Sequence, residues 1–294
     1  MRVALGTWAL GGGNDWGNTS DQAAHETLCA ALDNGVRIID TAPIYGAGLA
    51  EQRVGRAIKH RRAEVLLATK CGISLAGGRP DHDLSPQSII AECEASLRRL
   101  QTDYIDVYQI HWPDPKVPLA DSVEALARLQ EQGKIRTVGV CNFSLTQVQQ
   151  MLQIMPLTWV QQQFSLLQPK AEKLRTFCKE KGLALWAYGV LGGGILSGKY
   201  KRAPNFRRCD ARRYFYKYYF GEGFARAARV AARVKQLADK KQVSSAAIAL
   251  SWALYQSGVS GVLFGARCAK QVEENVQAAM INFTLDELDF LVND

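Results

Sequence analysis

The sequence predicts a (β/α)8 barrel that forms one domain over residues 1–294. Short apolar, β-rich runs alternate with segments of helical periodicity along the whole chain, which is typical of repeated βα units. Eight such runs occur, at residues 3–7, 36–40, 65–70, 105–111, 137–140, 159–163, 184–188 and 261–264. Eight is the number of strands in a closed barrel of this kind, and 294 residues with 47% hydrophobic content suffice for one such core.

Helix-terminal residues support this count. Ser20 is placed to cap a helix that ends at Asn34-Gly35, and Ser85-Pro86 is typical of an N-cap followed by proline at the first helical position. Gly133 and Gly182 follow helical runs, where a left-handed residue is favoured. Helical segments at 224–240 and 244–256 are expected between the seventh and eighth strands, and a last helix at 285–292.

Composition restricts the class of protein. There is no apolar run long enough to cross a bilayer and no signal peptide pattern, so a cytoplasmic location without membrane contact is expected. The seven cysteines are scattered without a Cys-x-x-Cys pair, which argues against a disulfide framework or a structural zinc site, and no metal is expected.

The net charge of +8 is concentrated in one segment. Residues 199–217 hold eight basic side chains and one acid, Asp210, which gives +7. The segment follows the seventh strand, where barrels often bind phosphate, so we favour an anionic cofactor as its partner. A nucleic-acid patch is the alternative, because aromatic residues are interleaved with the charges, but no nucleic-acid partner is expected. These aromatic residues are Tyr214, Phe215, Tyr216 and Tyr218.

Four polar residues lie at or just after the ends of predicted strands: Asp40, Tyr45, Lys70 and His111. The C-terminal ends of parallel barrel strands converge on one mouth, so these side chains are expected to meet there. Taken alone, three of them have ordinary explanations: Asp40 as a loop cap, Lys70 as a surface lysine and His111 as a core histidine. Together, an acid, a phenol, an ammonium and an imidazole form a proton-transfer site.

The segments around these residues resemble the catalytic motifs of the aldo-keto reductase superfamily. The matching segments are Ile-Asp-Thr-Ala-Pro-Ile-Tyr-Gly at 39–46, Thr-Lys-Cys-Gly at 69–72 and Gln-Ile-His-Trp-Pro at 109–113. Segments 6–8, 265–267 and 274–275 match as well, so the resemblance covers nearly the whole chain, and it is closer to microbial members than to vertebrate hydroxysteroid reductases.

The resemblance implies an NADPH-dependent reductase that converts small aldehydes or ketones to alcohols. Tyr45 would donate the proton, and the Lys70 ammonium would lower the pKa of its phenol. Asp40 would hold Lys70 in place and charged, and His111 would either orient the substrate oxygen through a hydrogen bond or share in proton transfer. We expect a monomer or a small homo-oligomer. The substrate would be set by loops at 71–84, 111–118 and 200–223.

The cofactor NADP(H) is expected to lie across the mouth of the barrel. No Gly-x-Gly-x-x-Gly follows a strand, so a Rossmann mode is not supported. By the resemblance, Tyr188 stacks on the nicotinamide, Asn142 and Gln161 hold its carboxamide, and Arg267 takes the 2′-phosphate, which favours NADP(H) over NAD(H). The full expected contact set is Thr7, Trp8, Asp40, Cys141, Asn142, Gln161, Tyr188, Gly189, Val190, Leu191, Gly193, Lys199, Gly265, Arg267, Gln271, Glu274 and Asn275.

Two residues depart from the family pattern. Cys141 stands where a serine usually precedes the asparagine, either as a cofactor contact or as a small buried thiol. Phe164 stands where relatives often carry tyrosine, which bears on the polarity of the substrate pocket.

Two other functions are open at this point. One is a Schiff-base aldolase or isomerase that uses Lys70, since such lysines also lie at barrel strand ends. The other is a cofactor-sensing regulatory subunit similar to the β subunits of potassium channels.

Overall fold

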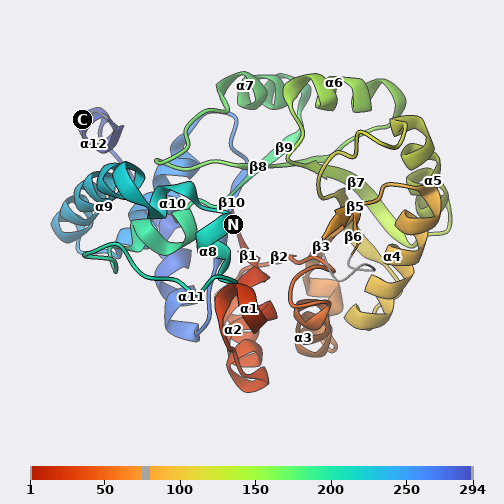
Figure 1. Cartoon of the computed structure of the whole chain (residues 1–294), viewed down its shortest axis with the longest axis horizontal. Helices are drawn as coiled ribbons and strands as arrows, with labels where there is room; N and C mark the ends of the chain where they lie inside the picture. Colours follow the sequence, from red (N-terminus) through yellow and green to blue (C-terminus); the bar gives the residue numbers. More distant parts are fainter. Residues whose placement is uncertain (1, 75–79, 293–294) are drawn as a thin grey trace.

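The computed structural model describes residues 2–74 and 80–292, and within them eight parallel strands close into a barrel (Figure 1). The predicted (β/α)8 fold is confirmed. In the order in which they pair around the barrel, the strands are β1 (Val3–Gly6), β10 (Gly261–Gly265), β9 (Ala184–Tyr188), β8 (Trp159–Gln163), β7 (Ile135–Cys141), β6 (Ile105–Ile110), β3 (Leu66–Cys71) and β2 (Ile38–Asp40).

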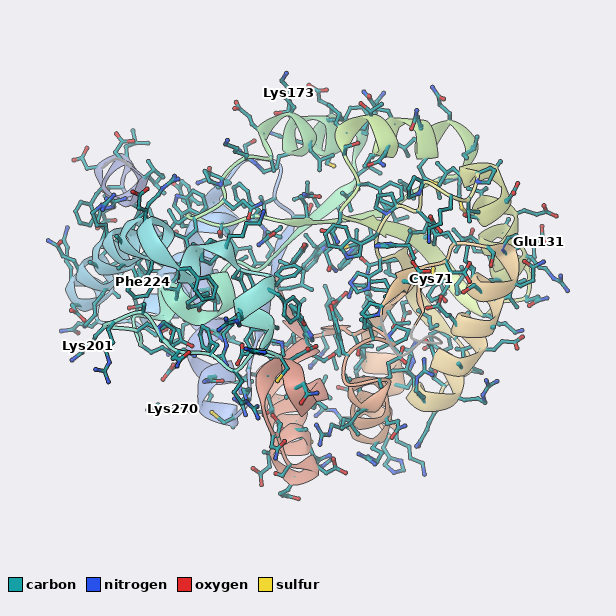
Figure 2. The ribbon with its side chains drawn as sticks, in the orientation of Figure 1. Cys71, Glu131, Lys173, Lys201, Phe224 and Lys270 are labelled. Carbon is teal, nitrogen blue, oxygen red and sulfur yellow. The ribbon has the colours of Figure 1, made fainter. Side chains whose placement is uncertain are left out.

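Helices surround this ring of strands (Figure 1). They are α1 (Gly13–Trp16), α2 (Asp21–Asp33), α3 (Leu49–Ile58), α4 (Pro86–Leu100), α5 (Leu119–Glu131), α6 (Leu145–Ile154), α7 (Glu172–Lys181), α8 (Ala211–Tyr214), α9 (Gly221–Lys241), α10 (Ser245–Tyr255), α11 (Ala269–Val276) and α12 (Leu285–Val292). The predicted caps are present: Ser20 Oγ accepts from the Ala23 amide at 3.1 Å, and Ser85 Oγ from the Ser88 amide at 3.3 Å. On the outside, Glu131 and Lys173 point away from α5 and α7 (Figure 2).

The barrel interior has an apolar layer below a polar one. Trp159 and Trp186 stack with ring centroids 4.6 Å apart and pack with Ala4, Val107 and Leu263. Side chains alternate between the two faces of a strand, so the next inward position along a strand lies one layer nearer the mouth. That layer contains Asp40, Lys70, Gln109 and Gln161, all buried. The polar layer therefore packs on an apolar layer that contains two stacked tryptophan rings.

Three features of the loops were not predicted. A two-stranded hairpin, β4 (Ile73–Ser74) with β5 (Asp81–His82), follows β3. The short helix α1 follows β1, and α8 belongs to the long connection between β9 and β10. Asp15 of α1 accepts from Trp8 Nε1 at 3.0 Å and from the Tyr214 hydroxyl at 2.9 Å. This carboxylate ties the first loop of the barrel to the long connection.

The helices of the described residues include none that is long and apolar enough to cross a membrane.

Candidate active site

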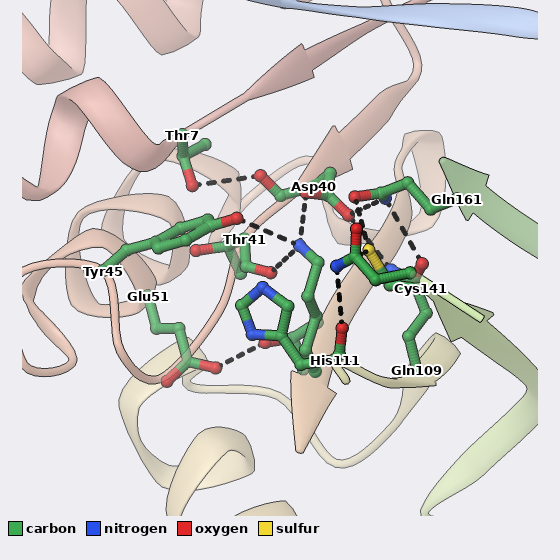
Figure 3. Close-up of polar contacts among 12 residues, drawn as sticks. Thr7, Asp40, Thr41, Tyr45, Glu51, Gln109, His111, Cys141 and Gln161 are labelled. Carbon is green, nitrogen blue, oxygen red and sulfur yellow. Dashed lines mark hydrogen bonds and ion pairs between the residues drawn. The ribbon is translucent and has the colours of Figure 1, made fainter. Parts of the chain in front are cut away.

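The structure brings all four residues of the predicted proton-transfer site together at the mouth, and Figure 3 labels three of them, Asp40, Tyr45 and His111. Asp40 ends β2, Lys70 lies near the end of β3, His111 follows β6, and Tyr45 lies in the turn after β2. Lys70 Nζ is 2.6 Å from Asp40 Oδ1 and 3.4 Å from the Tyr45 hydroxyl. The Tyr45 and His111 rings meet edge to face, with centroids 6.1 Å apart.

Lys70 is fully buried, and its ammonium has three oxygen acceptors. Besides Asp40 Oδ1 and the Tyr45 hydroxyl, it donates to the Thr41 carbonyl at 2.9 Å. Burial alone would lower the pKa of Lys70, but the acidic groups around it, with Asp40 the largest contributor, together outweigh burial and raise that pKa above its ordinary value. Lys70 is therefore held as a cation.

The expected decrease in the Tyr45 pKa is not observed. Burial raises the pKa of the Tyr45 phenol to about 12, and the opposing effect of Lys70 is smaller. The sequence predicted that the Lys70 ammonium lies next to the Tyr45 phenol. It could not predict how far burial of the ring would raise the phenol pKa. Tyr45 is consequently a neutral phenol at physiological pH, and Lys70 limits how far its pKa rises.

His111 is neutral. Burial lowers its pKa well below the ordinary histidine value, and the charge of Lys70 acts in the same direction. Its backbone carbonyl accepts from Asn142 Nδ2 at 3.0 Å, which ties the end of β6 to the end of β7. A neutral imidazole has one N–H group and can donate it to a substrate oxygen. It does so without placing a second positive charge beside Tyr45.

Asp40 uses both of its carboxylate oxygens. Oδ1 pairs with Lys70, and Oδ2 accepts from Gln161 Nε2 at 2.8 Å and from Gln109 Nε2 at 3.0 Å. Gln109 and the Thr41 carbonyl were not among the predicted site residues. The signal available for Gln109 was its position two residues before His111, which places it on the inward face of β6.

The predicted carboxamide-binding residues are adjacent. Asn142 has a left-handed backbone, with φ of 62°, and its side-chain oxygen accepts from the Tyr188 hydroxyl at 2.6 Å. The Cys141 thiol lies 3.6 Å from Gln161 Oε1 and 3.2 Å from Asn142 Nδ2. Burial raises the pKa of Cys141 to about 12, so it is a neutral thiol that contacts two predicted cofactor residues.

The glycine-rich loop after β9 is packed so closely against neighbouring side chains that a Cβ at Gly193 has no space. Gly189, Gly193 and Gly194 all have positive φ, and a Cβ at Gly193 would lie 2.8 Å from the Tyr216 ring. Val190 is buried and Leu191 is half-buried beside these glycines. Lys199 follows with an exposed side chain, as a phosphate-binding lysine requires. Backbone amides and a cation on this loop fit a pyrophosphate.

The loop after β10 carries the predicted adenosine-end residues. Gly265 ends the strand, and exposed Arg267 donates from Nη2 to the Asn18 carbonyl at 2.7 Å, which leaves other guanidinium donors available. Gln271 turns back to accept from the Arg267 amide at 2.8 Å, and Glu274 is 4.0 Å from Lys270 Nζ. Asn275 is buried. Arg267 is therefore the member of this group best placed to meet a phosphate.

Aromatic rings line the outer side of the site. Trp8 stacks on Tyr45 with centroids 5.8 Å apart, and Phe215 meets Trp8 edge to face at 5.4 Å. Thr7 is fully buried and donates from its hydroxyl to the Asp40 carbonyl at 3.0 Å. The cofactor contacts of Thr7 and Trp8 remain predictions.

Phe164 does not bear on the polarity of the substrate pocket, and that expectation is wrong. Its ring is buried and stacks on Trp252 of α10 with centroids 5.4 Å apart. The ring is thus part of the core between the barrel and the helices, where a hydroxyl would need its own partner.

The aromatic residues of the basic segment give little support to a nucleic-acid surface. Tyr216 is buried, and Phe215 and Tyr218 are half-buried against the protein, which leaves Tyr214 as the exposed member of the four. Base stacking needs exposed ring faces.

Comparisons with known proteins agree with this geometry. The family model described as "Aldo/keto reductase family" matches residues 2–291. Aldo-keto reductase YhdN of Bacillus subtilis is 38% identical over 92% of this chain and 83% of its own length. The NADH-specific methylglyoxal reductase of Escherichia coli is 35% identical over 96% of this chain and 91% of its own length.

The fold comparison gives the same result. The solved structure of a glycerol dehydrogenase from Gluconobacter oxydans matches with a TM-score of 0.89 at 36% identity, covering 99% of this chain and 91% of that one. The chain therefore belongs to the aldo/keto reductase family, whose members are oxidoreductases that act on carbonyl compounds with a nicotinamide cofactor.

Proposed function

We propose that this enzyme reduces aldehydes or ketones with NADPH and that Tyr45 delivers the proton. The observation that carries the proposal is the buried Lys70 ammonium, held 2.6 Å from Asp40 Oδ1 and 3.4 Å from the Tyr45 hydroxyl. When bound, the reduced nicotinamide would supply the hydride to the carbonyl carbon.

The side chains of this enzyme would handle the charge that builds on the substrate oxygen. Tyr45 is protonated at physiological pH and can give its proton to an alkoxide, which is a much stronger base than a phenolate. Lys70 stabilises the phenolate left behind, since its charge is fixed by Asp40. The neutral His111 imidazole can donate to the same substrate oxygen and orient it.

The preference for NADPH is supported by Arg267 and by the basic segment at 199–217. Arg267 is exposed at the start of the loop that leads to α11, with donors beyond the one used on Asn18. A guanidinium binds phosphate through charge-assisted bonds that NADH, which lacks the 2′-phosphate, cannot make. The Escherichia coli relative is named NADH-specific, so both cofactors belong in the test.

The Schiff-base alternative is disfavoured by the state of Lys70. A lysine nucleophile needs a neutral amine, and here the Asp40 contact raises the pKa of Lys70. The cofactor-sensing alternative predicts binding without turnover.

The deciding experiment follows NADPH oxidation by absorbance across a panel of aldehydes, ketones and sugars, with NADH in parallel. We expect turnover with small carbonyl compounds and a preference for NADPH. Cofactor binding without turnover on any substrate would favour the sensing function, and borohydride trapping of substrate on Lys70 would favour the Schiff-base function.

A further inference from the structure

Gln109 has no role in the mechanism described so far, yet it contacts the residue that fixes Lys70. Its side chain is fully buried, and Nε2 donates to Asp40 Oδ2 at 3.0 Å. Gln161 Nε2 donates to the same oxygen at 2.8 Å. Two neutral amides thus hold the oxygen of Asp40 that Lys70 does not use.

The orientation of both amides follows from what the neighbouring atoms can do. A carboxylate oxygen only accepts, so each NH2 group must face Asp40. The Cys141 thiol lies 3.6 Å from Gln161 Oε1, and Gln109 Oε1 lies 3.3 Å from Gln161 Nε2. Each amide nitrogen of Gln109 and Gln161 therefore has an acceptor, and each amide oxygen has a donor. The hydrogen-bond network thus fixes one orientation of the two side chains (Figure 3).

The barrel makes space for Gln109. It pairs in register with Lys70 on β3 and with Gly139 on β7. A Cβ at position 139 would lie 3.1 Å from Gln109 Cγ and 2.9 Å from Trp159 Cβ, so glycine leaves the volume that the glutamine side chain occupies. The side chain is thus confined to the polar layer beside Asp40.

We propose that Gln109 is a positioning residue that fixes the Asp40 carboxylate for Lys70 and keeps Oδ2 satisfied when Gln161 engages the carboxamide of the cofactor. This inference rests on the proposed function. Without Gln109, Gln161 would be the one amide shared between Asp40 and the cofactor, and the carboxylate would be freer to rotate away from Lys70.

The first test replaces Gln109 by methionine, which has a similar shape and no N–H donor. Losing a hydrogen bond to a charged group is worth about tenfold or more, so we expect kcat to fall at least roughly tenfold. The matched control is Gln162→Met on β8, where the glutamine Oε1 is buried without a hydrogen-bond partner among the described residues. Equal kcat in Gln109→Met and the parent would overturn the proposal.

The second test places a carboxylate against Asp40 with Gln109→Glu. Two carboxylates in contact cannot both ionise readily, so the folded-state pKa of the introduced acid should be raised. Stability and kcat should then be near parental at low pH and be lost as pH rises through that pKa. A variant that follows the parental pH profile throughout would contradict the proposal. If Gln109→Met fails to fold, the pH dependence of Gln109→Glu still tests whether Gln109 positions Asp40.

The third test needs no turnover and so separates this inference from the proposed function. Denaturant unfolding is measured for Gln109→Met, Asp40→Asn and the double variant, all without cofactor. Because a hydrogen bond to a charge is stronger than one to a neutral amide, the two substitutions should be non-additive. Additive effects would show that Gln109 only fills space, whether or not the enzyme reduces carbonyl compounds.

Discussion

Tyr45 is subject to two opposing influences, and their balance determines what it can do. Burial raises the pKa of the phenol to about 12, while Lys70 favours the phenolate. The phenol thus keeps its proton at physiological pH but has a cation in place for the moment when the proton leaves. This combination suits a proton donor better than a ground-state phenolate would.

Replacement of Tyr45 by phenylalanine tests this role directly. Loss of a general acid should reduce kcat by at least roughly 100-fold, because the phenol is the group proposed to give its proton to the substrate oxygen. The NADPH dissociation constant, measured by quenching of protein fluorescence, should change little. Near-parental turnover at saturating NADPH would rule out Tyr45 as the donor.

Arg267 makes a prediction about cofactor choice. Arg267→Ala removes a charge-assisted contact worth about 1.5–3 kcal/mol, so the NADPH dissociation constant should rise roughly 10- to 150-fold. Binding of NADH and maximum turnover should be nearly unchanged, since the contact is remote from the reacting carbon. Lys270→Ala at the start of α11, three residues further along the chain, is the control, because its exposed cation is already 4.0 Å from Glu274. Equal weakening of both cofactors would mean that Arg267 is structural.

The meeting of the four residues of the proposed proton-transfer site was predictable because strand ends in a barrel share one mouth. Gln109 could not be singled out in the same way, since glutamine at a strand end has no characteristic chemistry until its partner is known. The sign of the Tyr45 pKa shift depends on how much water the fold excludes, which no motif encodes. Phe164 was assigned to the pocket from a family pattern, but its direction is set by packing on α10.

At the scale of single elements, α4 anchors the start of the loop that follows β3. Glu92 Oε1 accepts from the Gly72 amide at 3.0 Å and from Ser88 Oγ at 3.2 Å. Its other oxygen is buried without a hydrogen-bond partner among the described residues. Burial raises the pKa of Glu92 from 4.5 to about 7. The start of the loop that follows β3 is therefore hydrogen-bonded to the Glu92 carboxyl, whose pKa lies near neutral pH.

This shift predicts how stability depends on pH. Because its pKa is raised in the folded state, Glu92 contributes fully to the free energy of unfolding below pH 4.5. This contribution is lost as pH rises through about 7. The loss corresponds to roughly 3 kcal/mol. Glu92→Gln keeps an acceptor for Gly72 and cannot ionise, so the variant should gain stability relative to the parent across that range. The check is denaturant unfolding at several pH values, and parallel curves for parent and variant would contradict it.

Regular elements were predictable where local signals and periodicity agree. Helix α12 begins and ends where the sequence predicted it, and each barrel strand was found, because caps and apolar runs are local features. The hairpin of β4 and β5 has two residues in each strand, too few for any periodicity. Helices α1 and α8 have four residues each and are held by long-range contacts such as that of Tyr214 with Asp15.

At the scale of the whole molecule, charge is distributed unevenly. The segment at 199–217 carries +7 of a net charge of +8, and it belongs to the connection that leads from the glycine-rich loop. Most of its basic side chains are exposed, whereas Arg212 is paired with Asp210 at 2.6 Å. The molecule thus presents a local positive field beside the proposed cofactor site.

This field should accelerate cofactor association in a salt-dependent manner. Exposed charges are screened over a Debye length of about 8 Å at physiological ionic strength, so stopped-flow association of NADPH should slow as salt rises. NADH, with less negative charge, should show a weaker dependence. Association that is indifferent to salt would contradict steering. Micromolar binding of duplex DNA at physiological salt would instead support the nucleic-acid alternative.

The pairing of β1 with β10 has a consequence for synthesis on the ribosome. Val3 of β1 is in register with Val262 of β10, so the barrel cannot close until β10, the last strand to be synthesised, has been made. Until then, β1 and β9 are open edges with unpaired backbone groups, a state that invites association with other chains. A nascent chain that stops before Gly261 would carry Tyr45, Lys70 and His111 but would lack the closed barrel whose burial shifts their pKa values.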